Sequence, residues 1–297
     1  MKKLSNQRFN EACAFVEQYA RPLDRAFLAF WKGDSDKEEV VCELQAYQNE
    51  DGGFGHCLEP DFRLNDSSPM ATTMAFQYIT KLGLSKTHSL VTGGLPYFRD
   101  TFHSQKSRWH AVPKAVNDVP HAPWWNVTDN EQKYSANPDA EIVGYLHYYN
   151  GDESITSDML AVVMNHLSDM NDYEIHEVLC YLRLGKLVGG DVEQKIVSQI
   201  SKQLPYIVDR PEKWDHYGVQ PIVLADSEQS PFFKELNQEI NVNLDYIVDK
   251  QQRDGSWEPS WSWGQYNDEW EIAKQEWKGY LTVQQLMVLS EFGRIAD

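Results

Sequence analysis

Apolar residues recur every three to four positions along most of the chain, which is the spacing of one helical face. The first such run consists of Phe9, Cys13, Val16 and Ala20, and Pro22 interrupts it. The same spacing predicts helices at about 40–47, 70–82, 138–150, 154–169, 173–186, 191–207, 235–251 and 280–292. Because no convincing series of alternating strands accompanies these runs, the sequence predicts an all-α protein.

Three of the predicted helices end in a similar way. The strings YITKLG, CYLRLG and VLSEFG each place a charged residue, a large apolar residue and a glycine at the helix end. Gly83, Gly185 and Gly293 are therefore expected in the left-handed conformation that closes a helix. Similar endings repeated along an all-helical chain indicate stacked helical hairpins.

One short motif occurs twice. QNEDGGF at 48–54 and QQRDGSW at 251–257 share the pattern Gln-x-x-Asp-Gly-x-aromatic. The two copies are about 200 positions apart, which leaves room for about four or five helical hairpins of roughly 40–50 residues each. The pattern is typical of a hinge, because glycine lets the chain reverse, Asp can cap the next helix, Gln can bond free backbone groups, and the aromatic ring wedges between neighbours.

The repeated motif and the residues that follow its first copy resemble a known superfamily. QNEDGGFG at 48–55, followed by SSPMATTMAFQYITKLG, resembles the repeats of protein prenyltransferase β subunits and squalene-type terpenoid cyclases, and QQRDGSW resembles their glutamine–tryptophan repeat. That superfamily folds as an α/α toroid, with inner and outer rings of helices around a central cavity. The resemblance implies one such domain over residues 1–297, with a long non-periodic loop rich in Pro, Trp and His at about 104–137.

The catalytic motifs of that superfamily are missing. The sequence has no Asp-x-Cys pair for zinc, no Asp-x-Asp-Asp motif for protonating a triterpene, and no Asp-Asp-x-x-Asp motif for diphosphate. Protein prenylation and squalene cyclisation are therefore not expected. P-loop and dinucleotide fingerprints are absent as well, so no cofactor is expected.

The net charge of -18 restricts the partners of the protein. It argues against nucleic acid and anionic membranes, whose phosphates call for basic patches, and leaves a small-molecule ligand as the expected partner. The four cysteines form no CxxC pair, the N-terminal segment does not read as a signal peptide, and no stretch approaches the ~18 apolar residues of a membrane span. A cytoplasmic location follows as an expectation, and the oligomeric state stays open.

The segment HCLEPDFRLNDS, directly after the first copy of the motif, holds the leading candidates for chemistry. Under the toroid resemblance it lies at the rim of the cavity. Glu59 and Asp61 can divide acid and base roles, while His56 and Arg63 can bind substrate. The alternative is a purely structural role, in which these charged residues cap helices and pair with one another. A metal site formed by His56, Glu59 and Asp61 is a weaker alternative, because no fourth ligand is identifiable, and no metal is expected.

Glu141 is a third candidate catalytic carboxylate, because it opens a predicted helix that would face the cavity if it belongs to the inner ring. The helix dipole alone also favours a glutamate in a first turn. Substrate-binding candidates come from the strings HAPWW and SWEPSWSWG. They are His121, Trp124, Trp125, Trp261 and Trp263, whose aromatic faces suit sugars or carbocations.

The leading hypothesis is therefore an enzyme with carboxylate acid/base chemistry in an acidic, tryptophan-rich pocket that takes a small or medium organic molecule. One rival is an α/α-barrel glycosidase or lyase acting on a saccharide. Another is a non-catalytic binding scaffold, in which Glu59 and Asp61 are ion-paired outward.

Overall fold

The computed structural model describes residues 1–128, 133–150 and 153–296, and their regular secondary structure is helical, with only isolated β-bridges besides. The predicted all-α class is confirmed. The α-helices are α1 Asn6–Tyr19, α2 Pro22–Lys32, α3 Lys37–Gln45, α4 Pro69–Lys81, α5 Ser89–Asp100, α6 Asp139–Asn150, α7 Glu153–Asp169, α8 Ile175–Val188, α9 Gly190–Ser201, α10 Leu204–Ile207, α11 Phe233–Lys250 and α12 Asn267–Glu291. Short 3₁₀ helices are η1 Lys114–Asp118, η2 Pro123–Trp125, η3 Pro211–His216 and η4 Pro221–Val223. No described helix has the length and apolar character needed to cross a membrane.

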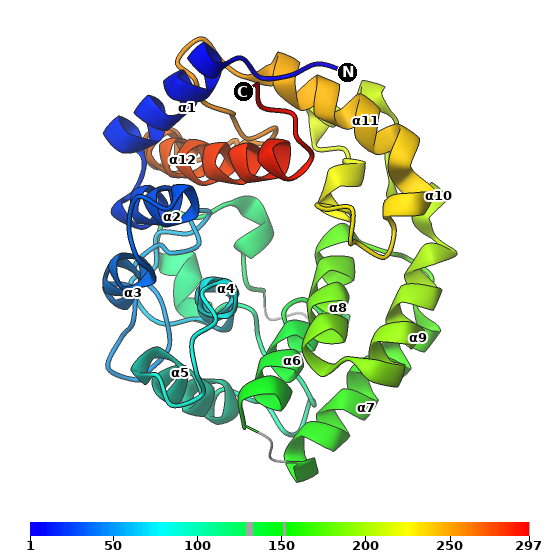
Figure 1. Ribbon diagram of the computed structural model, residues 1–297. Coiled ribbons are helices and arrows are strands. Elements are labelled where there is room, and N and C mark those ends of the chain that lie inside the picture. The colour runs from blue at the N-terminus through cyan, green and yellow to red at the C-terminus, as the bar shows by residue number, and fades with distance from the viewer. Residues whose placement is uncertain (129–132, 151–152, 297) are drawn as a thin grey trace. The chain divides into compact units, whose positions relative to one another are not determined.

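The chain forms two compact units. Unit 1 consists of Met1–Leu44 together with the chain from Val208 onward, and unit 2 consists of Gln45–Ile207. In unit 1, α12 packs against α1 and α2 (Figure 1). In the same unit, α11 packs against η4. In unit 2, α6 packs against α8, α7, α5 and α4. The single domain expected over residues 1–297 stays a prediction.

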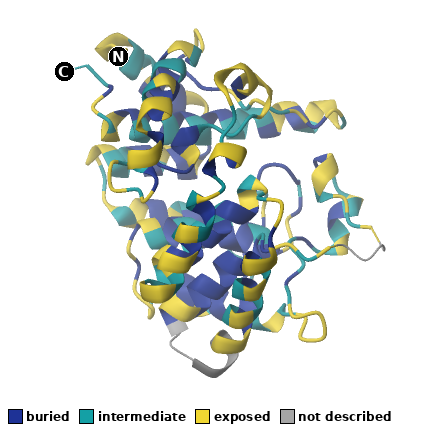
Figure 2. Cartoon of the chain, turned by 90° about the vertical axis from the view of Figure 1, so that its right-hand side faces the viewer, coloured by how far each residue is buried: buried dark blue, intermediate teal, exposed yellow. Residues whose placement is uncertain are grey.

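Buried aromatic rings tie α4, α5 and α6 together in unit 2. The ring of Phe76 lies 5.1 Å from those of Phe98 and Tyr145, and the rings of Phe98 and Tyr145 stack at 6.5 Å. All three side chains are at most 1% exposed. Helices with one buried and one exposed face are visible in Figure 2, which is the amphipathic pattern from which they were predicted.

Helix ends agree with two of the three glycine predictions. Gly83 and Gly293 have φ of 62° and 60°, as expected. The prediction for Gly185 was wrong, because α8 runs on to Val188 and ends at Gly189, with φ of 73°. A Cβ on Gly185 would lie 3.4 Å from the Cα of Glu193, so this glycine allows α8 and α9 to pack closely.

The two copies of the repeated motif fold into the same turn. In each copy the backbone N–H of the second residue donates to the carbonyl of the sixth, at 2.9 Å in the first and 2.8 Å in the second. Their glycines, Gly52 and Gly255, have φ of 83° and 89°, which only glycine adopts readily. The aspartates Asp51 and Asp254 each accept the N–H two residues on, at 2.9 and 3.0 Å, and so brace the turn itself rather than cap the next helix.

The opening glutamine fixes each turn to a neighbouring helix. Gln48 donates to the carbonyl of the glycine in its own copy at 2.9 Å and to the carbonyl of Leu90 in α5 at 3.4 Å. Gln251 makes the equivalent pair, with its own glycine at 2.8 Å and with Arg8 in α1 at 2.8 Å. Both copies therefore use the same side-chain amide for the same two tasks.

The closing aromatic residue docks each turn on the following helix. The N–H of Phe54 donates to the hydroxyl of Thr72 in α4 at 3.0 Å, and that of Trp257 donates to Thr282 in α12 at 3.1 Å. The Phe54 and Trp257 side chains are 0% and 5% exposed. The expected roles of the glycine, the glutamine and the aromatic residue are confirmed in both copies, whereas the expected helix cap by the aspartate was wrong, because Asp51 and Asp254 bond within the turn.

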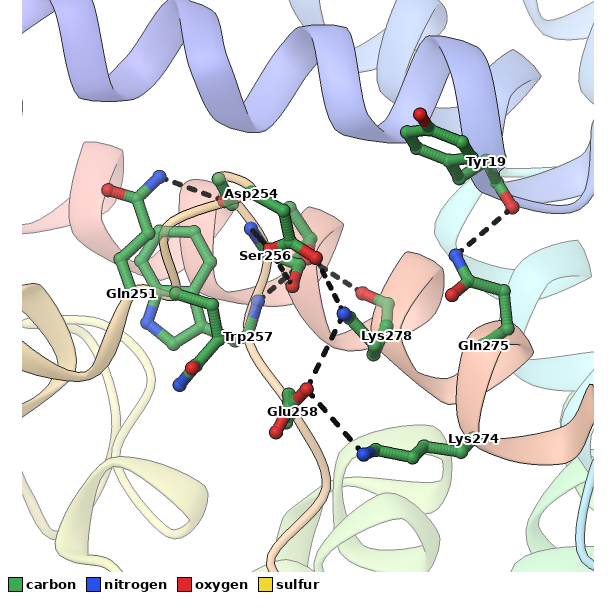
Figure 3. Close-up of polar contacts among 12 residues, drawn as sticks. Tyr19, Gln251, Asp254, Ser256, Trp257, Glu258, Lys274, Gln275 and Lys278 are labelled. Atoms are coloured by element: carbon green, nitrogen blue, oxygen red, sulfur yellow. Dashed lines mark hydrogen bonds and ion pairs between the residues drawn. The ribbon is translucent and has the colours of Figure 1, made fainter. Parts of the chain in front are cut away.

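An ion pair distinguishes the second copy. Asp254 accepts from Nζ of Lys278 at 2.7 Å, and Lys278 also lies 3.5 Å from a carboxylate oxygen of Glu258 (Figure 3). In the first copy the corresponding aspartate, Asp51, accepts from the hydroxyl of Ser67 at 2.7 Å instead. Burial raises the pKa of Asp254, but hydrogen bonds from Lys278 and Ser256 outweigh it and leave that pKa below its ordinary value.

This ion pair predicts a contribution to stability that depends on pH. A carboxylate with a lowered pKa stabilises the folded state above its unfolded pKa of about 3.9, and the contribution is lost as the pH falls through the folded pKa. Lys278→Met keeps the apolar stem and removes the charge. We expect urea unfolding between pH 5 and pH 2.5 to show a shallower loss of stability in this variant than in the native protein. Parallel curves would exclude the ion pair as a source of acid sensitivity.

Candidate functional site

The segment after the first copy, residues 55–66, forms a closed loop in unit 2, here called the 55–66 loop. Its two arms are joined by backbone hydrogen bonds from His56 to Asn65 at 3.1 Å and from Cys57 to Leu64 at 3.2 Å. His56 and Cys57 have φ of 52° and 59°. Two successive non-glycine residues in the left-handed region are uncommon, and such strained backbone clusters at functional sites.

The loop buries both predicted carboxylates. Glu59 and Asp61 are each 5% exposed, and Oε2 of Glu59 accepts the backbone N–H of Asp61 at 2.7 Å. This bond fixes the orientation of the Glu59 carboxylate relative to Asp61. His56 is exposed and Arg63 is half-buried, so the four predicted residues of this loop differ in their access to solvent.

A second segment, residues 119–125, lies against the 55–66 loop. The carbonyl of Asp61 accepts the N–H of Ala122 at 2.7 Å, and the N–H of Arg63 donates to Pro120 at 2.8 Å. The bridge between Phe62 and His121 lies between these bonds. The sequence-predicted residues of the two segments are thus brought together, although they are far apart along the chain.

His121 and Trp125 have defined orientations beside the 55–66 loop. Nδ1 of His121 lies 2.7 Å from the carbonyl of Val119, so Nδ1 carries the proton because a carbonyl only accepts. The Trp125 ring meets Phe62 edge to face at 5.6 Å. Its indole N–H is buried and has no hydrogen-bond partner. A buried donor of this kind is rare, and an acceptor on a bound ligand would satisfy it.

Trp124 differs from its neighbour, because 51% of its surface is exposed. It follows Pro123 on the short helix η2, which begins with proline at a position where no backbone N–H is needed. Trp124 belongs to the segment 119–125 that lies against the 55–66 loop, and its exposed indole face can serve as a stacking platform.

Glu141 is held by contacts from α6 and α8. Its Oε1 accepts from the hydroxyl of Tyr145 at 2.5 Å, and its Oε2 accepts from Nη1 of Arg183 at 2.9 Å. The thiol of Cys180 lies 3.5 Å from the same Oε2. Burial, reinforced by the Glu141 carboxylate, raises the pKa of the Cys180 thiol, so it stays protonated. These contacts give Glu141 a role in joining two helices.

Trp261 and Trp263 belong to unit 1. The Trp261 ring lies 5.2 Å from Trp277 and 5.6 Å from Tyr217, both nearly perpendicular to it. Trp263 is 2% exposed and packs on Trp270 at 5.7 Å. The expectation that these two tryptophans share a pocket with the 55–66 loop stays a prediction.

Metal binding by His56, Glu59 and Asp61 is not supported. Within residues 1–128, 133–150 and 153–296, no group of three or more His, Cys, Asp or Glu side chains is arranged to hold a metal ion.

Sequence reasoning missed a buried polar pair in unit 2, Asp139 and Tyr134, which lines a cavity. Asp139 stands in the first turn of α6, where the helix dipole explains an acidic residue without any further role. The available signal was a tyrosine in the aromatic 104–137 segment shortly before that helix.

Comparison of the chain with models of protein families, with curated proteins and with solved structures gives no match in any of the three.

Proposed function

We propose that the protein is an α/α toroid of the terpenoid cyclase and prenyltransferase type that binds a small or medium organic molecule beside Glu59 and Asp61. In this proposal the two carboxylates carry out acid/base chemistry on the bound molecule. The observation that carries it is the burial of both carboxylates, at 5% exposure each, in a loop with strained backbone at His56 and Cys57. Carboxylates are almost never fully buried without a structural or chemical reason.

The toroid proposal is supported by which helix each motif copy meets. The first turn packs on α5, the next helix after α4 along the chain, and the second turn packs on α1, although α12 is the last helix. The start of the chain thus takes the place that the next repeat would fill. The N–H of Leu4 also donates to the carbonyl of Arg294 at 2.7 Å, and the N–H of Ala296 donates to that of Leu4 at 2.8 Å. A ring of repeats that closes on itself requires this arrangement.

The proposed chemistry divides among the residues as follows. Glu59 is oriented by the backbone of Asp61, and either carboxylate can accept or return a proton. His121 is oriented by the hydrogen bond between its Nδ1 and the carbonyl of Val119, and its imidazole can take part in proton transfer. The buried indole N–H of Trp125 donates to an oxygen of the ligand. Together these groups suit an organic molecule with an apolar body and a hydroxyl or carbonyl group.

A saccharide ligand is the second candidate, favoured by the exposed ring of Trp124. Sugars stack their CH faces on such rings, and buried carboxylates are the usual acid and base of glycosidases. Under the non-catalytic scaffold alternative, Glu59 and Asp61 are ion-paired outward, and the burial of both side chains disfavours it.

A thermal-shift screen tests the proposal with farnesol, cellobiose and magnesium chloride as probes. We expect farnesol to raise the melting temperature of the native protein by several degrees and to lose at least half of that shift in Glu59→Gln and Asp61→Asn, because the buried carboxylates contact its hydroxyl. Asp66→Asn is the matched control, since Asp66 is an exposed acid of the same loop and should leave the shift unchanged. Equal shifts in all four proteins would remove Glu59 and Asp61 from the site, and a shift with cellobiose alone would support the saccharide alternative.

A further inference from the structure

Unit 2 contains a cavity of about 260 Å³ between α6, α7 and the segment that carries Trp109. Its walls are mainly apolar, with Phe102 and Trp109 on one side and Val143, Met159 and Val163 from the two helices. The volume is somewhat below the range of drug-sized pockets. At about 30 Å³ for each water in the liquid, it corresponds to a molecule of about nine non-hydrogen atoms.

A buried carboxylate faces this cavity with one oxygen unsatisfied. Asp139 is 1% exposed, and its Oδ1 accepts the backbone N–H of Trp109 at 3.1 Å. Neither its Oδ2 nor the buried hydroxyl of Tyr134, which also lines the cavity, makes a hydrogen bond of good geometry, although Tyr134 lies close enough to Asp139 to lower the pKa of that carboxyl. A buried carboxylate oxygen without a well-formed hydrogen bond is uncommon, so Oδ2 of Asp139 marks a polar position in this apolar cavity that a hydrogen-bond donor of a ligand would complete.

The charged groups around the cavity indicate the sign of the charge that a ligand bound there would carry. Asp158 provides a second carboxylate at an exposed position of the lining, and no Lys, Arg or His is found among the described residues that line it, although Arg108 lies near enough to lower the pKa of Asp139. The whole chain carries a net charge of -18, which favours the approach of cations. Oδ2 of Asp139 can only receive a hydrogen bond when ionised, whereas the walls offer contact to carbon atoms.

We infer that this cavity binds a small organic ammonium ion, whose N–H groups donate to Oδ2 of Asp139 and whose apolar body lies against Trp109, Phe102 and Met159. The hydroxyl of Tyr134 completes the polar end of the site. No residue of the site belongs to the 55–66 loop or to the segment that packs on it, so the inference does not depend on the function proposed above.

Three probes of nearly equal size separate the possible ligands: 2-phenylethylammonium, 2-phenylethanol and phenylacetate. Binding is followed by titration calorimetry and by the methyl NMR signals of Val143, Val162, Val163 and Met159. We expect the ammonium ion to bind at least tenfold more tightly than the alcohol, the anion to bind most weakly, and these methyl signals to shift. If no probe shifts them, the cavity holds water only and the inference fails. It also fails if the alcohol or the anion binds as well as the ammonium ion.

Asp139→Asn keeps the acceptor for the Trp109 N–H and replaces Oδ2 by an NH₂ group. We expect it to weaken binding of the ammonium ion at least tenfold and binding of the alcohol less than threefold. Asp158→Asn is the matched control, because an exposed carboxylate is screened by water, and it should weaken ammonium binding less than threefold. Equal losses in the two variants, or none in Asp139→Asn, would contradict the assignment.

The pH dependence of the native protein provides a test that needs no variant. Burial raises the pKa of Asp139 to about 7, against the opposing effects of the Trp109 N–H, Tyr134 and Arg108, with Glu177 adding a further small rise. Because protonated Asp139 cannot pair with a cation, the dissociation constant of the ammonium ion should rise about tenfold for each pH unit below that value. The dissociation constant of 2-phenylethanol should stay constant. An unchanged ammonium affinity between pH 7 and pH 5 would overturn the inference.

Discussion

Alanine in place of Gly52 or Gly255 should destabilise the protein by about 4 kcal/mol. A Cβ at Gly52 would lie 2.2 Å from the carbonyl oxygen of Gly93 in α5, and one at Gly255 would lie 2.4 Å from that of Glu11 in α1. The neighbour is backbone in both cases, so the clash cannot be relieved by turning a side chain. Both positions also have φ near 85°, which adds the cost of left-handed backbone for alanine. Urea unfolding of the two variants measures the loss.

Gly33 and Gly83 provide controls for the conformational part of that loss. They have φ of 80° and 62°, but nothing lies within 4 Å of a Cβ added to either. Alanine there should cost only about 1–2 kcal/mol, the expense of the left-handed conformation alone. If all four variants lose the same amount, close approach of the turn to its neighbouring helix does not matter, and the structural equivalence of the two motif copies has no energetic meaning.

Glu141→Ala should destabilise the protein by about 3 kcal/mol, because it breaks a buried ion pair and leaves the hydroxyl of Tyr145 without its acceptor. The estimate is at the low end for buried pairs, since the side chain of Arg183 is 36% exposed and stays partly hydrated. Glu141→Gln keeps an acceptor for Tyr145 and should lose about half as much. Chemical denaturation of the two variants gives both values.

The same two variants separate a structural role from a catalytic one at Glu141. A structural role predicts that ligand-induced stabilisation by farnesol persists in Glu141→Gln, as it does in Asp66→Asn. If Glu141→Gln unfolds like the native protein but abolishes the farnesol shift, the helix-joining interpretation of Glu141 is wrong and its candidacy as a catalytic carboxylate is strengthened.

Hydrophobic spacing predicted most helices but missed α2 and α5, for identifiable reasons. The hydrophobic spacing predicts that Pro22 breaks the first helical run, whereas it is the first residue of α2, where proline needs no hydrogen-bond partner. Gly93, Gly94 and Pro96 lie inside α5 and lower its helical propensity. The same glycines allow the turn of the first motif copy to approach α5. The residues that weaken the helical pattern in the sequence are therefore the ones that the packing requires.

Local sequence predicts the turn of the repeated motif well, because its bonds lie within seven residues. The partners of that turn could not be predicted, since they come from helices far along the chain, such as Arg8 for Gln251. Glu59 and Asp61 were found because they stand out after the motif, yet their burial depends on tertiary packing. Asp139 was missed for the same reason: its burial beside a cavity depends on tertiary packing and not on the sequence around it.

The claim that the 55–66 loop is the ligand site is tested most directly by a crystal structure of the protein grown with farnesol. The account predicts the hydroxyl of farnesol within hydrogen-bond distance of Glu59 or Asp61, with its chain against Phe62 and Trp125. Farnesol bound elsewhere, with the carboxylates of the 55–66 loop untouched, would contradict that claim.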